Sequence, residues 1–150
     1  MKLILAAIGL RASRASAFDD LVETYRSRTA AFADVETAVF RSTEAFFASI
    51  DRLRARTPSV LVLLDARGKQ LSSEELARWL GRMRDEGQQR IVFAIGPADG
   101  WTDADRQRAT LLLSMGPMTL PHELARVIIS EQVYRAFTIL AGHPYHTGHV

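Results

Sequence analysis

Cysteine is absent from this chain, and lysine occurs only at Lys2 and Lys69. Without a thiol, the 150 residues can form no disulfide, thiolate zinc site or cysteine nucleophile. No apolar run approaches the roughly 20 residues that a transmembrane helix needs. The composition, 47% hydrophobic and 24% charged, is that of an ordinary globular chain. Its length suits a single domain, residues 1–150, that buries a substantial core and has no membrane partner.

Arginine therefore supplies nearly all of the positive charge, and the formal net charge is only +2. Guanidinium groups suit phosphates and stacked bases, although a GC-rich genome would produce the same arginine bias. With so small a net charge, a nucleic-acid partner has to be met by a local patch of cations.

The first residues permit two interpretations. Lys2 to Ile8 is an apolar run that ends at Gly9, which is typical of a buried first strand. The same run, with small residues at Ala15 and Ala17, also imitates a secretory signal peptide. The apolar run is at the short limit for a signal peptide, and Arg11 and Arg14 precede the possible cleavage site. We favour the strand.

Strand patterns alternate with helical patterns along the rest of the chain, which predicts an α/β fold with a mainly parallel sheet and helices on both faces. Period-2 or wholly apolar segments predict strands, and apolar stripes between Gly and Pro breaks predict helices. The expected strands are 35–39, 59–64, 90–95 and 111–113, and the expected helices are 16–33, 42–54, 72–87, a short one after Thr102, and 122–140. Ser72 and Glu75 have the spacing of a capping box, and Thr102 and Asp105 can also form a cap.

Three polar, turn-rich segments follow expected strands: 65–69, 96–101 and 114–121. Ligands of parallel sheets bind beyond the carboxyl ends of the strands. If these three strands are neighbours, the segments converge on one crevice.

The expected last helix, His122 to Leu140, starts after Pro121 and is apolar on several sides. A helix of this kind must be covered on several sides. Because a chain of this size has one core, a second copy of the chain is the natural further cover, which predicts a homodimer.

The loop after Ile95 lacks the spacing of a dinucleotide fingerprint or a P-loop. Three of the four histidines, His143, His146 and His149, lie in a short tail without a carboxylate at ligand spacing, so we expect no metal site. His122 is the histidine at an expected helix N-terminus beside the crevice, where the helix dipole favours the neutral imidazole. The alternative is that His122 simply packs against the first helical turn.

Arg126 follows His122 by one helical turn, so the two could face an anion together. Arg135 follows Glu131 at i+4, which favours a structural ion pair. Tyr145 and His146, near the C-terminus, supply aromatic and cationic groups that could stack on unpaired bases. A frayed terminus is the alternative for this tail.

Four segments together resemble the 23S rRNA pseudouridine N3-methyltransferases of the SPOUT class. They are MKLILAAIG, LDARGKQLSSEELA, FAIGPADGW and the long block MTLPHELARVIISEQVYRAFTILAGHPYH. The resemblance spans most of the chain in order, and the last block is the most specific. The segment 39–58 matches least.

The resemblance implies a SPOUT-like fold with a C-terminal trefoil knot, an obligate homodimer and a cytoplasmic enzyme. It implies transfer of a methyl group from S-adenosylmethionine to N3 of a pseudouridine in the 23S rRNA of the assembled ribosome. Cofactor contacts then fall on Leu64, Gly96, Met115, Gly116, Pro117, Met118, Thr119 and Leu120. His122, Arg126, Tyr145 and His146 are the candidates for handling the RNA and its proton.

Pro97 stands where the family has the second glycine of its loop, and Ala98 follows it. Proline fixes φ and removes an N–H that could face the cofactor. The alternative function is therefore a catalytically weak dimer that keeps the fold and binds ribosomal RNA.

Overall fold

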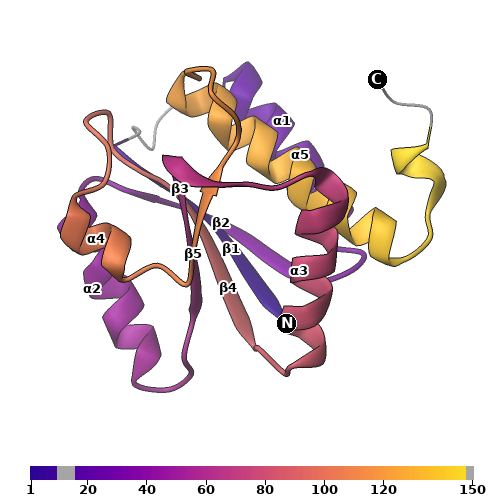
Figure 1. Cartoon of the computed structure of the whole chain (residues 1–150), viewed down its shortest axis with the longest axis horizontal. Coiled ribbons are helices and arrows are strands. Elements are labelled where there is room, and N and C mark those ends of the chain that lie inside the picture. The colour runs from indigo at the N-terminus through magenta and orange to yellow at the C-terminus, as the bar shows by residue number, and fades with distance from the viewer. Residues whose placement is uncertain (10–15, 148–150) are drawn as a thin grey trace.

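The computed structural model describes residues 1–9 and 16–147. Within them, five strands form one parallel sheet in the order β2-β1-β4-β3-β5 (Figure 1). The strands are β1 (Lys2–Ile8), β2 (Asp34–Phe40), β3 (Val60–Gln70), β4 (Arg90–Ile95) and β5 (Leu111–Ser114). The helices are α1 (Ala17–Thr29), α2 (Thr43–Arg54), α3 (Ser73–Asp85), α4 (Asp103–Gln107), α5 (His122–Leu140) and the 3₁₀ turn η1 (Pro144–His146). The predicted parallel sheet with helices on both faces is confirmed.

Alternate residues of the strands feed two apolar clusters, one on each face of the sheet. In β1, Leu3 and Leu5 pack with residues of α3 and α5, whereas Ile4 and Ile8 pack with α2 and Trp101. Figure 1 shows the same division, with α2 and α4 on one side of the sheet and α1, α3 and α5 on the other. Both faces being covered explains why the strands are apolar without alternation.

The first strand is confirmed at the predicted bounds. β1 lies between β2 and β4, and Leu3 and Ala7 are fully buried. Arg11, Arg14 and Ala15, on which the signal-peptide alternative depends, lie outside the described residues.

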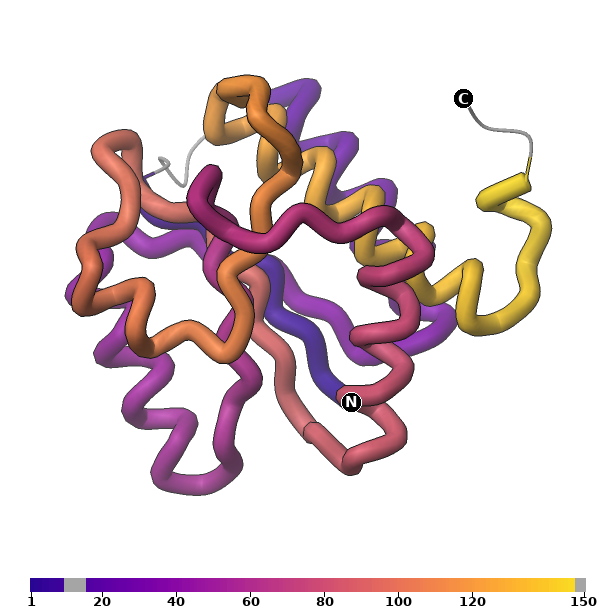
Figure 2. The backbone as a smooth tube through the Cα atoms, in the orientation of Figure 1, coloured from indigo at the N-terminus to yellow at the C-terminus, as the bar shows by residue number. Residues whose placement is uncertain are grey.

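The prediction of a polar turn at 65–69 is wrong, because β3 continues to Gln70. After a register shift between Leu64 and Lys69, the end of β3 resumes pairing with β5, where Lys69 pairs with Leu113 and Gln70 with Ser114. Polar residues are compatible with this extension because its side chains are mostly exposed. In Figures 1 and 2 this extension crosses in front of β5 and leads into α3.

Helix ends follow the expected caps. Ser72–Glu75 and Thr102–Asp105 each form a complete capping box. α1 ends at Thr29, four residues earlier than predicted, and its N-cap Ser16 forms a capping box with Asp19.

α5 has the predicted bounds and packs among the sheet, α1 and α3 of its own chain. Val133 and Ala136 are fully buried, and Phe137 stacks against Phe32. Much of its all-round apolar surface is thus covered within the chain, while Leu124 remains 38% exposed. Across residues 1–9 and 16–147, no helix combines the length and hydropathy needed to cross a membrane.

Candidate functional site

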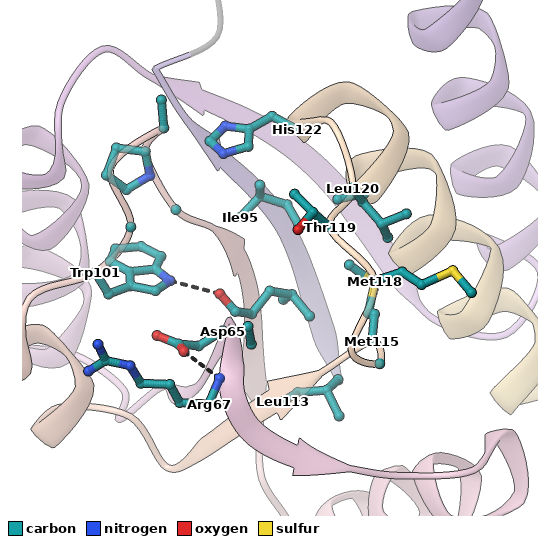
Figure 3. Close-up of a pocket in the computed structure, with 18 of the residues that line it drawn as sticks. Asp65, Arg67, Ile95, Trp101, Leu113, Met115, Met118, Thr119, Leu120 and His122 are labelled. Atoms are coloured by element: carbon teal, nitrogen blue, oxygen red, sulfur yellow. Dashed lines mark hydrogen bonds between the residues drawn. The ribbon is translucent and has the colours of Figure 1, made fainter.

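A cavity of about 370 Å³ lies beyond the carboxyl ends of β4 and β5 and beside the middle of their neighbour β3, where its pairing with β5 shifts register. Segments 65–67, 95–101 and 115–120 form its walls, so the predicted convergence of three segments is observed (Figure 3). The cavity is lined by every residue expected to contact the cofactor: Leu64, Gly96, Met115, Gly116, Pro117, Met118, Thr119 and Leu120. Their role as cofactor ligands remains a prediction.

The loop between β5 and α5 brings main-chain polar groups to the cavity. Gly116 has a φ of 112° and donates its N–H to the Ser114 hydroxyl, which fixes the start of the loop. Among the described residues, the N–H groups of Met118, Thr119 and Leu120 have no hydrogen-bond partner. The opposite wall contributes apolar groups from Leu64 and other residues. Apolar walls with a few free polar groups are typical of a small-molecule site.

Trp101 organises a second wall, and the sequence reasoning did not single it out. Its indole N–H donates to the Leu64 carbonyl over 3.0 Å, and the side chain is buried (Figure 3). A Cβ at Gly96 would lie 2.8 Å from Trp101 Cε2, so glycine lets the two segments approach closely. The Leu64 carbonyl is consequently engaged, and Leu64 offers the cavity chiefly its side chain.

A buried ion pair supports the same wall. Arg106 Nε donates to Asp65 Oδ2 over 2.6 Å, with the two side chains 18% and 6% exposed. Burial alone would raise the pKa of Asp65, but the Arg67 N–H, the Arg106 hydrogen bond and both guanidinium charges together lower it. Asp65 is therefore ionised at neutral pH and joins α4 to the end of β3. The sequence analysis did not predict Asp65 or Arg106 as residues of the site. The available signal was an acidic residue, Asp65, directly after the apolar run 59–64.

His122 also lines the cavity, at the first residue of α5. Pro121 precedes it with no side-chain cap, and the His122 side chain lies beside the cavity in Figure 3. Its imidazole is the cavity-lining group best suited to accept a proton.

Arg126 does not line the cavity. Its guanidinium donates to Asp19 Oδ1 over 2.7 Å and is 12% exposed, so it joins α5 to α1. The hydrogen bond from Arg126 is the main cause of the lowered pKa of Asp19. Within one chain, His122 and Arg126 are thus not brought together on one ligand.

The C-terminal turn η1 packs on α5 and α3 rather than fraying. Tyr145 donates its hydroxyl to Glu131 over 3.1 Å and stands edge-on to Tyr134. Burial, followed by the Glu131 charge, raises the pKa of Tyr145 to about 12, so the phenol is protonated at neutral pH. His146 contacts Glu74 through Nε2 over 2.7 Å.

Tyr145 and His146 both lie away from the cavity of their own chain. The predicted Glu131–Arg135 ion pair is confirmed at 2.7 Å. Across the part of the chain that the structure describes, no group of three histidine or acidic side chains could hold a metal ion, and His149 lies outside that part.

Comparison with known proteins defines the class. A family model described as predicted SPOUT methyltransferase matches residues 1–146. The ribosomal RNA large subunit methyltransferase H of Koribacter versatilis is 51% identical over 149 residues, covering 99% of this chain and 100% of the relative. This chain belongs to the ribosomal RNA large subunit methyltransferase H family within the SPOUT methyltransferases.

Other relatives share part of their length with this chain. The protein of the same name from Brucella ovis is 56% identical over 88 residues, which are 59% of this chain and 52% of that relative. The SpoU methyltransferase AviRb from Streptomyces viridochromogenes superposes with a TM-score of 0.51 and 17% identity, over 94% of this chain and 61% of AviRb. A probable methylase family protein from Haemophilus influenzae superposes with a TM-score of 0.56 and 12% identity, over 93% of this chain and 66% of that protein. These two likenesses support the fold alone.

Proposed function

We propose that this protein is an S-adenosylmethionine-dependent rRNA methyltransferase that methylates N3 of a pseudouridine in 23S rRNA of the assembled ribosome. The observation that carries the proposal is the cavity itself. The cavity lies next to adjacent parallel strands in a chain that belongs to this family. It is lined by the residues that we expect, from the resemblance to the family, to contact the cofactor.

The cavity suits S-adenosylmethionine chemically. Adenine needs apolar walls and main-chain hydrogen bonds, and the loop 115–120 offers free N–H groups at Met118, Thr119 and Leu120 beside the side chain of Leu64. Gly96 and Gly116 keep the walls free of side chains. We assign these residues, with Met115 and Pro117, to cofactor binding.

When bound, the cofactor supplies an electrophilic sulfonium methyl group. The protein then has to hold the ring nitrogen in line with the S–CH₃ bond and to accept its proton. Positioning of this kind accounts for about 7–11 kcal/mol in well-oriented model reactions. The imidazole of His122 lines the cavity and would accept the N3 proton, while the new N–C bond replaces the S–C bond.

Arg126, Tyr145 and His146 are assigned to the RNA from outside the cavity of their own chain. They would meet a target base at the cavity of a second copy, so the proposal includes an obligate homodimer. It also includes one SPOUT-like domain over residues 1–150, the C-terminal trefoil knot of the family, cytoplasmic location, and no metal in the reaction.

Calorimetry of S-adenosylmethionine binding to the purified protein is the first test. We expect saturable binding at one site per chain or per dimer, followed by methyl transfer to ribosomes that lack the modification. Substituting His122, Arg126, Tyr145 or His146 with alanine should lower the single-turnover rate if the residue handles RNA. An unchanged rate would remove that residue from the mechanism.

The alternative function, a catalytically weak dimer that binds ribosomal RNA, is favoured by Pro97. This residue lines the cavity and lacks an N–H, and its carbonyl accepts the Gly100 N–H in a turn. No binding at millimolar cofactor, together with retained ribosome binding, would replace the enzyme by this alternative.

A further inference from the structure

A second hollow, separate from the cavity, runs between α3 and the edge of the sheet at β5. This α3 groove has a volume of about 660 Å³ and shares no lining residue with the cavity. Its apolar floor includes Leu71, Trp79, Leu111 and Leu140. None of the residues that line this groove has a role in the proposed methyl transfer.

Cations dominate the rim of the α3 groove. It is lined by Lys69, Arg78, Arg82 and Arg84 against two acids, Glu75 and Asp85. Arg84 pairs with Asp85, and Glu75 Oε2 already accepts the Ser72 N–H in the helix cap. The groove therefore has four cations against two carboxylates, a net charge of +2.

The side chains of Lys69, Arg78 and Arg82 have no ion pair or hydrogen bond within residues 1–9 and 16–147. Elsewhere in the chain, Arg106 and Arg126 are held by carboxylates at 2.6 and 2.7 Å. Arg78 and Arg82 are four residues apart on one helix face, about 6 Å along its axis. Like charges at this spacing destabilise a helix. An external anion would offset that repulsion.

The end of β3 connects the two hollows directly. Asp65 and Arg67 line the cavity, whereas Lys69 and Leu71 line the α3 groove. In Figure 1 this stretch crosses β5 and leads to the start of α3. A strand of nucleic acid with its target base beside the cofactor cavity could therefore continue into the groove.

We propose that the α3 groove binds the phosphodiester backbone of the substrate RNA through Lys69, Arg78 and Arg82. The inference rests on the proposed function and extends it to a second contact surface outside the cavity. The cations contact phosphate oxygens and read no sequence, so they contribute affinity and orientation rather than base choice.

The test compares three double variants with the wild-type chain. Arg78→Ala with Arg82→Ala removes two groove charges, and Arg78→Lys with Arg82→Lys keeps them. The matched control is Arg52→Ala with Arg56→Ala. Arg52 lies in the last turn of α2 and Arg56 two residues after its end; both are exposed, and neither side chain has an ion pair or hydrogen bond among the described residues. α2 lies on the opposite side of the sheet (Figure 1). Binding to protein-free 23S rRNA and to ribosomes is measured over a range of salt, with the KM and kcat of methylation and cofactor affinity by calorimetry.

We expect the alanine groove variant to weaken RNA binding and raise KM roughly tenfold, and to lower the salt slope by about 2. Its kcat and cofactor affinity should be unchanged, and the lysine and control variants should resemble wild type. If the alanine groove variant keeps the wild-type KM and salt slope, the proposal that the α3 groove binds the RNA backbone is wrong. Weakened binding to ribosomes with unchanged binding to free RNA would overturn it too, because a protein partner would be indicated. Failure of the wild type to bind cofactor or methylate would instead reject the proposed function.

Discussion

Trp101 holds two walls of the cavity in place, since it hydrogen-bonds Leu64 and covers Gly96. A side chain that fixes the geometry of a ligand site affects both stability and ligand affinity. Its indole N–H is the group to test, because it satisfies a buried carbonyl.

Trp101→Phe removes that N–H and keeps an aromatic ring. We expect the free energy of unfolding to fall by about 1–2 kcal/mol because the Leu64 carbonyl loses the indole donor. The smaller ring adds a separate loss of packing. Trp79→Phe is the control, since the side chain of Trp79 is also buried and its indole nitrogen has no hydrogen-bond partner among the described residues. Urea unfolding of both variants, with calorimetry of cofactor binding, measures the difference. If Trp101→Phe and Trp79→Phe lose the same free energy of unfolding and bind the cofactor with the same affinity, the hydrogen bond to Leu64 contributes nothing.

Asp65 and Arg106 form the most deeply buried ion pair at the cavity wall. Asp65→Ala leaves Arg106 with only the exposed Asp103 as its partner, and we expect a loss of about 2–4 kcal/mol in the free energy of unfolding at pH 7. Asp103→Ala is the control: Asp103 contacts the same guanidinium but is 87% exposed, so about 0–1 kcal/mol is expected. Equal losses in both variants would contradict the importance of burial.

The same pair predicts a pH dependence. The pKa of Asp65 is lowered in the folded state, so its stabilisation is present above the unfolded pKa of about 3.9. That stabilisation is lost as the pH falls through the folded-state pKa. Denaturant unfolding from pH 7 downward should therefore show a gap between wild type and Asp65→Ala that narrows only below about pH 4. A gap that is constant down to pH 2 would contradict this assignment.

At the scale of elements, period and capping in the sequence predicted the strands and helices well. Local signals include wholly apolar strands such as 90–95 and the capping boxes that begin at Ser72 and Thr102. The structure has a strand or a helix start at each of these places. The extension of β3 through polar residues could not be predicted, because its cause is pairing with β5, about 45 residues later in the chain. The cavity segments were predicted, whereas the Trp101 and Asp65 contacts depend on tertiary packing that periodicity does not encode.

Gly68 is the residue on which that extension depends. A Cβ there would lie 2.6 Å from the main-chain carbon of Leu112, and backbone cannot yield as a side chain can. We expect Gly68→Ala to destabilise the chain by about 2–4 kcal/mol. Gly81→Ala is the control, because its Cβ would meet only a terminal methyl of Leu140 at 3.0 Å, and alanine favours a helix by about 1 kcal/mol. Thermal unfolding measures both; a neutral Gly68→Ala would contradict the close approach.

At the scale of the whole molecule, the covering of α5 by its own chain changes the argument for a dimer. Four large apolar residues remain exposed. Leu21 (45%) and Leu124 (38%) lie in the first halves of α1 and α5, Met118 (83%) lies in the loop before α5, and Phe32 (39%) follows α1. Leu124→Glu places a charge on this surface without entering the core. We expect dimer affinity to fall about tenfold or more by sedimentation, with helical content unchanged. Ala55→Glu, exposed at the end of α2, is the control and should remain dimeric. A monomeric wild type at micromolar concentration would contradict the dimer.

The distance of His146 from the cavity of its own chain makes a shared site testable. If each cavity uses the tail of the second copy, a chain with a damaged cavity and a chain with a damaged tail complement one another. Gly96→Ala damages the cavity, because its Cβ would collide with Trp101, and His146→Ala damages the tail. Each homodimer should be inactive. Random mixing makes half of the dimers mixed, and each of these holds one cavity intact in both parts, so about a quarter of wild-type activity should return. The matched control mixes Gly96→Ala with His122→Ala. Both variants damage the cavity, so a mixed dimer contains no intact cavity and no activity should return. No recovery in the first mixture would place tail and cavity of one site on the same chain, and the tail would then have to leave Glu74 to act.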